Sequence, residues 1–229
     1  LNFAGTLAND NTITLSNRGV SDIGAIRHIG SGKITLANPL SLGSLSSVTL
    51  ASDGATLNLT NTISTNGFRF EPTIGTANQT INISGDITGT GNLFVEGSEA
   101  GGSANSVVIL SAANSYSGTT TVSANALRLN HAGALGSTSS LSVSNNAELQ
   151  IGNVSVSAAP ATTLRGDGFD NLGVLKAVSG TGTFNGNITL ALDSVIGTTG
   201  SATLNLGGTI DNGGFGLTFN TNGGNITAS

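Results

Sequence analysis

The chain has 229 residues, of which 8% are charged and 37% hydrophobic, and its formal net charge is −5. With only seven Lys and Arg residues it lacks the basic surface that binding to a phosphate backbone needs, so nucleic acid is excluded as an expected partner. The absence of Cys excludes disulfides. The longest aliphatic run, "VVIL" at 107–110, is far shorter than the roughly 20 residues that span a bilayer, so we expect no membrane insertion by this segment.

Apolar residues alternate with polar ones along the whole chain. Alternation with a period of two predicts short strands that bury one face. No window has a sustained helical period, and 34 Gly residues would destabilise helices of normal length. We therefore predict an all-β fold, with strands at "ITL" (13–15), "TLNL" (56–59), "INI" (81–83), "LRL" (127–129), "ELQI" (148–151), "ITL" (188–190) and "TLNL" (203–206).

The sequence also repeats itself over a long period. "LNFAGTL" at 1–7 returns as "LNHAGAL" at 129–135, an offset of 129 − 1 = 128 residues. Later matches follow in the same order: "GAIR" at 24–27 with "GVLK" at 173–176, "GKITLA" at 32–37 with "GNITLA" at 186–191, and "ATLNLTNTI" at 55–63 with "ATLNLGGTI" at 202–210. Collinear matches indicate a long internal repeat. We predict one β-solenoid segment over 1–229, with a first copy at 1–128 and a second, incomplete copy at 129–229.

The offset between the copies grows by 147 − 128 = 19 residues around 146–164, where the sequence carries strand signals of its own. A β-solenoid accepts such an insertion as an extra coil, because each coil contacts only its neighbours. With about 20 to 25 residues per coil we expect roughly ten coils, and a strand spacing of about 4.8 Å gives a rod of about 50 Å. Gly and Asn are expected at the corners.

The stretch 89–129 resembles the passenger-associated transport repeat of autotransporter proteins, which pairs a "GxGxL" entry with an "LxGxNTYxGxTxV" core and a following "GxL". The matching residues are Gly89, Gly91, Leu93, Leu110, Asn114, Tyr116, Gly118, Thr120, Val122 and Leu127. Asn125 stands where the family has Gly, and Asn tolerates the left-handed conformation better than most residues. A looser similarity to such passengers extends over the rest of the chain.

This resemblance implies a right-handed parallel β-helix on the bacterial surface or outside the cell, exported through an outer membrane. In the family the repeat is associated with secretion and passenger folding and is not known as a catalytic element. The resemblance therefore implies structural roles for the motif residues, with no catalytic residue and no cofactor. Independently of the resemblance, the sequence has no initiator Met and no charged n-region followed by an apolar h-region, so we expect the chain to be an excerpt whose export signal lies outside it or has been removed.

Carboxylates and one adhesion-like tripeptide are the candidates for a binding or catalytic site. "RGD" at Arg165 to Asp167 matches the integrin-recognition tripeptide, although a Gly-rich corner is the simpler interpretation. Asp167 and Asp170 could form the acid pair of a glycoside-cleaving enzyme. The first copy carries only Asp22 there, so we interpret the pair, like Glu96 and Glu99, as solvated carboxylates.

Metal and phosphate sites are not expected. "GSGK" at 30–33 lacks the other residues of a phosphate-binding loop. His28 and His131 have no clustered partner, and His131 aligns with Phe3, which predicts a packing position. "NDN" at 9–11 and "SDG" at 52–54 are the only calcium candidates, but they lack the ligands that calcium requires.

Three functions remain open from the sequence. The first is a non-enzymatic surface protein, a passenger or adhesin stalk whose partner would be a ligand on a host or cell surface. The second is an extracellular filament, in which the chain partners itself by end-to-end stacking through unpaired strand edges. The third is a β-helical polysaccharide-active enzyme, which would need a cleft with convergent carboxylates.

Overall fold

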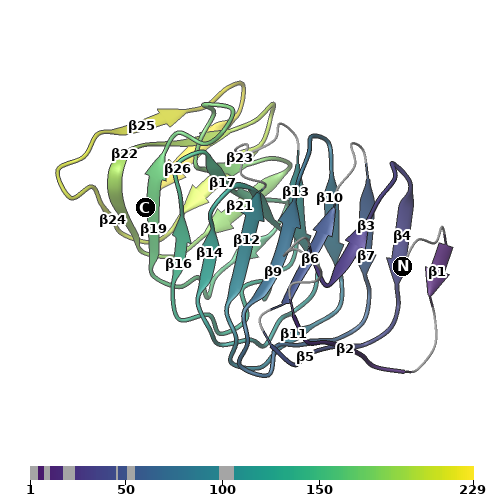
Figure 1. The fold of residues 1–229 in the computed structure, drawn as a ribbon. Coiled ribbons are helices and arrows are strands. Elements are labelled where there is room, and N and C mark those ends of the chain that lie inside the picture. The colour runs from purple at the N-terminus through teal and green to yellow at the C-terminus, as the bar shows by residue number, and fades with distance from the viewer. Residues whose placement is uncertain (1–4, 8–10, 18–23, 45, 51–54, 98–105) are drawn as a thin grey trace.

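The computed structural model describes residues 5–7, 11–17, 24–44, 46–50, 55–97 and 106–229. These residues form strands and turns, with no helix among them, and the strands stack along one axis from the N-terminal to the C-terminal end (Figure 1). Nowhere in the described ranges is there a helix with the length and apolarity needed to span a membrane. The predicted all-β solenoid is confirmed.

Each turn of the chain passes through three faces. The first face consists of β1 (Gly5–Leu7), β4 (Lys33–Leu36), β7 (Thr56–Leu59), β10 (Thr80–Ile83), β13 (Val107–Leu110), β15 (Asn125–Leu129), β17 (Ala147–Ile151), β20 (Leu175–Ala177) and β25 (Leu217–Asn220). The second face consists of β2 (Ile13–Leu15), β5 (Leu40–Leu42), β8 (Ile63–Ser64), β11 (Ile87–Thr88), β18 (Ser155–Val156), β21 (Thr181–Phe184), β23 (Thr203–Leu206) and β26 (Asn225–Ala228).

The third face consists of β3 (Ile26–His28), β6 (Ser46–Leu50), β9 (Phe70–Ile74), β12 (Leu93–Gly97), β14 (Thr120–Val122), β16 (Leu141–Val143), β19 (Thr162–Gly166) and β24 (Ile210–Asp211). The long strand β22 (Ile188–Thr198) runs from the third face into the first, where its second half pairs with β20 and β25. Strands on one face pair in parallel with the strands of the neighbouring turns.

The third face shows how the chain winds. From β3 to β24 it makes eight successive parallel pairings, so the described chain makes about eight turns there. Turn length varies: Val107 pairs with Ala126, a step of 126 − 107 = 19 residues, and Gly5 pairs with Ile34, a step of 34 − 5 = 29. Because each turn touches only its neighbours, loops of different length are accommodated locally.

The core is a set of aliphatic ladders running along the axis. Strand residues alternate between the interior and the surface, as in β10, where Ile81 and Ile83 are fully buried and Asn82 faces outward. Stacking places Ile81 beside Leu57 and Val108, so like side chains contact one another from turn to turn. Burial of these side chains in successive turns stabilises the stack.

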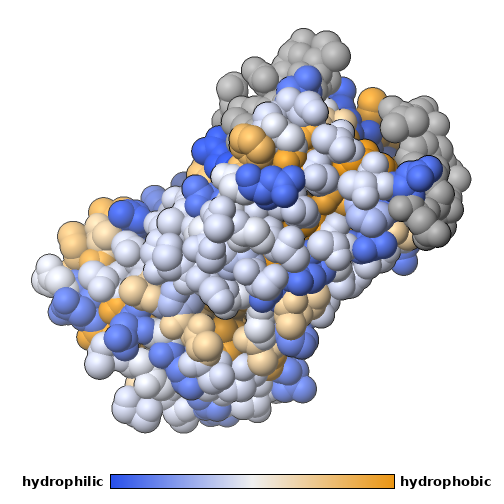
Figure 2. Space-filling view, turned by 90° about the horizontal axis from the view of Figure 1, so that it is seen from below, coloured by the Kyte–Doolittle hydropathy of each residue, from blue (hydrophilic) through white to orange (hydrophobic). Residues whose placement is uncertain are grey.

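Short polar side chains form the matching ladders on the outside. On the first face Asn58 Nδ2 lies 3.2 Å from Thr35 Oγ1, and Asn82 Nδ2 lies 3.4 Å from Asn58 Oδ1. Figure 2 shows the molecule from below, with pale, weakly polar residues over its middle and hydrophobic residues gathered toward its ends. Short, uncharged side chains are therefore common on the outside, in a chain of which only 8% of the residues are charged.

Segments of repeated sequence lie on different faces. "TLNL" at 56–59 is β7 on the first face, whereas the same letters at 203–206 are β23 on the second face. The segment 146–164 spans β17, β18 and most of β19, which is one passage through all three faces. Turn lengths accumulate along the chain, so the face that a segment occupies depends on everything before it.

Candidate functional site

Two of the motif residues, Asn114 and Tyr116, lie where the second face has no regular strand, between β13 and β14 in the chain. Tyr116 is fully buried, and its hydroxyl lies 2.7 Å from Thr120 Oγ1. Thr120 Oγ1 is in turn 3.0 Å from Thr138 Oγ1, and Thr138 donates to the Gly118 carbonyl at 2.6 Å. Burial raises the pKa of Tyr116 far above its ordinary value, so the phenol stays neutral and hydrogen-bonded.

Asn114 holds together three turns in the same region. Its Oδ1 accepts a hydrogen bond from the Ile87 backbone N–H at 2.8 Å, and its Nδ2 donates to the Ala134 carbonyl at 2.5 Å. These bonds replace the regular strand pairing that the second face lacks here. A buried amide that satisfies backbone groups of two neighbouring turns is a structural device.

The remaining motif residues provide core contacts and close backbone packing. The core members, all buried, are Leu93, Leu110, Val122 and Leu127. A Cβ on Gly91 would lie 1.9 Å from the Phe68 carbonyl oxygen, and one on Gly118 would lie 2.3 Å from the Gly91 carbonyl oxygen, so neighbouring corners touch through backbone. Gly89 has φ of +93° and Asn125 has φ of +60°, the left-handed conformation expected for Asn125.

The RGD tripeptide is not presented as a free loop. Arg165 is half-buried in β19 and donates to Ser142 Oγ at 3.0 Å, and Gly166 is buried. Asp167 lines an open groove of about 630 Å³ on the last turns, together with Asp193, Leu192 and Phe215. Asp193 accepts a hydrogen bond from the Gly216 backbone N–H at 2.7 Å.

The other sequence candidates stay apart from one another. His28 is buried, and burial lowers its pKa; His131 is exposed and accepts a hydrogen bond from the Gly133 N–H, so the packing position predicted for His131 is wrong. Asp22, Glu99, residues 9–10 and residues 52–54 lie outside the described residues. Within the described part of the chain, no three His, Asp or Glu side chains gather as a metal site requires.

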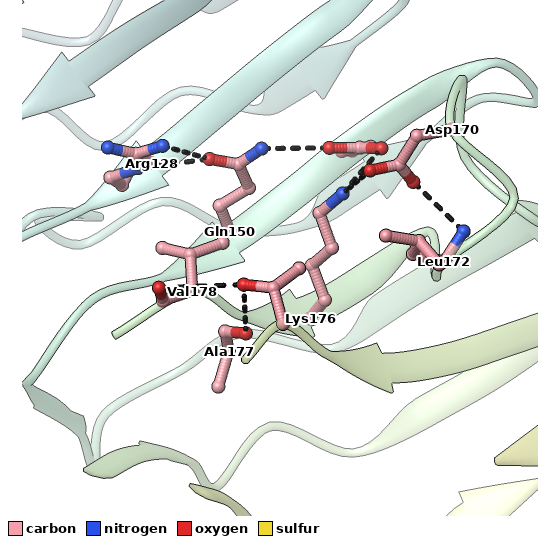
Figure 3. A network of polar contacts seen from close by, with 9 residues as sticks. Arg128, Gln150, Asp170, Leu172, Lys176, Ala177 and Val178 are labelled. Atoms are coloured by element: carbon pink, nitrogen blue, oxygen red, sulfur yellow. Dashed lines mark hydrogen bonds and ion pairs between the residues drawn. The ribbon is translucent and has the colours of Figure 1, made fainter. Parts of the chain in front are cut away.

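The structure brings together a charged cluster that the sequence did not reveal. Gln150 on β17 and Lys176 on β20 pair in register with Arg128 on β15, so these three side chains form one outward line on the first face (Figure 3). Glu148 lies two residues before Gln150 on β17 and so shares its outward side. Lys176 Nζ is 2.9 Å from Glu148 Oε1 and also contacts Asp170 Oδ2. Gln150 links the groups, because its Nε2 donates to Glu148 Oε2 at 2.8 Å and its Oε1 accepts from Arg128 Nε at 2.9 Å.

A short segment, which we call the strap (residues 167–174), covers this cluster. The strap joins β19 to β20 and closes on itself through a hydrogen bond from the Gly173 N–H to the Asp167 carbonyl at 3.0 Å. Phe169 lies against Lys176, whose ammonium is 5.5 Å from the ring centre. The Glu148 side chain is consequently 0% exposed and that of Lys176 only 3%, although both residues point away from the core.

Burial and charge set the protonation of the two carboxyl groups. Burial raises the pKa of Glu148 to about 7, although Lys176 and the hydrogen bond from Gln150 act in the opposite direction. Burial also raises the pKa of Asp170, but hydrogen bonds from Lys176, Glu148 and the Leu172 N–H outweigh it and leave that pKa below its ordinary value. Near neutral pH the cluster therefore holds an ionised Asp170 and a Glu148 that readily exchanges a proton.

Sequence reasoning missed this cluster because Glu148, Gln150 and Lys176 occupy ordinary outward strand positions. It treated Asp170 as a turn carboxylate paired with Asp167, whereas its carboxylate contacts Lys176 and accepts from the Leu172 N–H at 2.9 Å. The usable signal is that Arg128, Gln150 and Lys176 stack at one outward position in three successive turns, and it appears only once the register is known. Comparisons with protein-family models, with curated proteins and with solved structures find no match to this chain.

Proposed function

We propose that the chain is a non-enzymatic structural segment of a bacterial surface or secreted protein, a stalk of the autotransporter-passenger type. The supporting observation is the continuous core ladder with short polar side chains outside it, a design that gives length and stiffness. The charged cluster also fits this role, because the strap covers it and keeps it from substrates. The motif residues at 89–127 support a passenger-like stalk through their resemblance to the transport repeat.

We further propose a right-handed winding and roughly ten coils for the whole segment, which gives a rod of about 50 Å. Negative-stain electron microscopy of the purified segment at several concentrations tests this. A stalk segment gives rods of one length at all concentrations, whereas particles without elongation contradict the proposal. Assay of the same preparation on acidic and neutral polysaccharides adds a second test, since reproducible cleavage contradicts a non-enzymatic role.

End-to-end assembly is the second candidate function. Phe219 on β25 pairs with buried Ile196 and occupies an inward register, yet it is 47% exposed because no further turn lies beside it in the described chain. An adjacent turn, from this chain or another copy, would cover Phe219 and pair with the edges of β25 and β26. Filaments whose length grows with protein concentration favour this candidate over a simple stalk.

A polysaccharide-active enzyme is the third candidate, and the groove beside Asp167 and Asp193 is where it would act. The groove is open, and Phe215 gives it an apolar wall that could contact a sugar ring. If the polysaccharide panel shows cleavage, the double variant Asp167→Asn, Asp193→Asn must abolish it. Binding without cleavage would make the groove a carbohydrate-binding surface and leave the structural role in place.

A further inference from the structure

The Lys176 ammonium lies between two carboxyl groups in a nearly closed site. It contacts Asp170 Oδ2 and lies 2.9 Å from Glu148 Oε1, and the Phe169 ring lies beside it. Three ionisable groups in such a site cost solvation free energy that an ion pair only partly recovers. The same geometry places an amine, an acyl carbon and a proton-transfer group in mutual contact.

We propose that Lys176 Nζ and the Asp170 side chain are joined by an amide bond that the folded chain forms by itself, with Glu148 transferring the proton. The proposal rests on the contact of Lys176 with both carboxyl groups, on the burial of Lys176 and Glu148 under the strap and on the backbone donor at Asp170. It goes beyond the stalk function and does not depend on it.

The reaction is a condensation that balances without an oxidant or a co-reactant. Glu148 takes one proton from the Lys176 ammonium, and the neutral amine attacks the Asp170 Cγ atom, forming the C–N bond. The C–O bond to one carboxyl oxygen then breaks, and protons returned from Glu148 and from the attacking nitrogen convert that oxygen into water. One ammonium and one carboxylate become one neutral amide plus one water, and Glu148 ends as it began.

The site supplies the groups that such a reaction needs. The Leu172 N–H donates to Asp170 Oδ1 at 2.9 Å, so it can stabilise negative charge on that oxygen in the tetrahedral intermediate. Gln150 holds Glu148 through the bond to its Oε2, leaving Oε1 directed at Lys176. Burial makes Glu148 a better proton acceptor than an ordinary carboxylate. Holding the reactants together contributes effective molarities of roughly 10⁵ M or more.

Enclosure also favours the product. The amide replaces a buried charge pair with a neutral group, which removes the desolvation cost of both ions. The water released at the Asp170 carboxyl group can leave the site, because the Asp170 side chain is 32% exposed. The bond would tie the strap to β20 and so fix the strap over Glu148 and Lys176.

Mass spectrometry of the intact, folded protein tests the proposal directly. We expect a mass lower than the sequence mass by one water. Lys176 is the last Lys or Arg in the chain, so trypsin ordinarily yields peptides 166–176 and 177–229. A linked Lys176 resists trypsin, so the expected product is a single peptide, 166–229, that also lacks one water.

Variants identify the reacting atoms. Asp170→Asn offers the same acyl carbon with ammonia as the leaving group, so its linked product must have the same mass as the linked wild type. Lys176→Arg and Asp170→Ala must keep their full sequence mass. Glu148→Gln must slow the mass loss after refolding by roughly 100-fold or more, because it lacks the proton-transfer group. Lys33→Arg, at an exposed β4 position, is the matched control and must react normally.

Several results would overturn the proposal. If the folded wild-type protein has its full sequence mass and yields a normal 166–176 peptide, the amide bond does not form. A link between peptides 129–165 and 166–229 places the amide on Glu148 and makes the assignment to Asp170 wrong. If Glu148→Gln loses mass at the wild-type rate and its far-ultraviolet circular dichroism is like that of the wild type, Glu148 does not transfer the proton.

Discussion

The Tyr116 hydroxyl lies 2.7 Å from Thr120 Oγ1, four residues away and on the opposite side of a corner, and neither group is reached by solvent. The Thr120 hydroxyl is also hydrogen-bonded to the Thr138 hydroxyl in the next turn. Three buried hydroxyl groups therefore form a hydrogen-bonded chain that links two turns where the second face lacks strands. A polar chain in a core is stabilising only while each of its members has a partner. Its middle member should therefore matter most.

Substitutions along this chain are expected to destabilise the protein unequally. Tyr116→Phe leaves Thr120 bonded to Thr138 and should lower the free energy of unfolding by about 1 kcal/mol. Thr120→Val leaves the buried Tyr116 hydroxyl without the Thr120 partner and should cost about 2 to 3 kcal/mol. Urea unfolding of both variants measures the difference, with Thr121→Val on the outer face as the control. A loss in Thr120→Val no larger than in the control would contradict the network.

Close backbone packing at the corners predicts a second contrast, between two glycines. A Cβ on Gly118 would lie 2.3 Å from the Gly91 carbonyl oxygen, whereas one on Gly32 meets no atom within 4 Å. Neither residue needs a positive φ, so the contrast isolates the steric effect. Gly118→Ala should cost about 1 to 3 kcal/mol, because backbone must shift, while Gly32→Ala should be within about 0.5 kcal/mol of the wild type. Thermal unfolding of the two variants measures the contrast. Equal melting temperatures would show that the backbone at the Gly118 corner shifts at no cost in stability.

Glu148 predicts a dependence of stability on pH. Its folded-state pKa of about 7 lies above the ordinary value of 4.5, so between these values the folded state binds more protons than the unfolded state. The stabilisation that this group contributes to the folded state is therefore fully present below pH 4.5 and is lost as the pH rises through 7. Burial is the largest cause, so the direction holds whether or not Lys176 and Asp170 are linked.

The free energy of unfolding, measured by urea titration at about pH 5 and about pH 8, tests this against Glu148→Gln. The wild type should lose up to about 3 kcal/mol more over this range than the variant, which has no carboxyl group at this position. Equal losses in the two proteins would mean that Glu148 titrates like an exposed carboxylate. Glu96→Gln, at a half-buried position on β12, is the control for removing one negative charge.

The strands and corners of this fold can be predicted from local sequence. The face of the solenoid on which each strand lies cannot. Alternation in "INI" is enough to bury Ile81 and Ile83, and the left-handed conformation of Asn125 follows from its chemistry. The face occupied by each "TLNL" could not be predicted, because it depends on the summed lengths of all earlier turns. Short-range interactions fix the alternation of side chains and the corner conformations, whereas the stacking register is a long-range property.

The charged cluster was hidden for a related reason. Glu148 and Lys176 have the outward positions that alternation assigns to them, and their burial comes from the strap, which belongs to neither strand. Gly197 shows the same dependence: it pairs with Lys176 in the outer ladder of the first face, and the Leu172 carbonyl of the strap occupies the space that a side chain would need there. Sequence patterns predict the direction of a side chain but not what later segments place over it.

Gly197 supplies the last prediction, because the strap needs the space above it. A Cβ on Gly197 would lie 1.8 Å from the Leu172 carbonyl oxygen, so Gly197→Ala must displace the strap or the strand beneath it. Hydrogen exchange at residues 167–174 should then become about tenfold faster or more, since local opening costs less free energy. Gly216→Ala is the control, because its Cβ would meet Asp193 at an ordinary 3.4 Å. Unchanged exchange in Gly197→Ala would mean that contacts elsewhere, Asp170 with Lys176 first among them, hold the strap without the close approach of Leu172, and the role assigned to this glycine would be wrong.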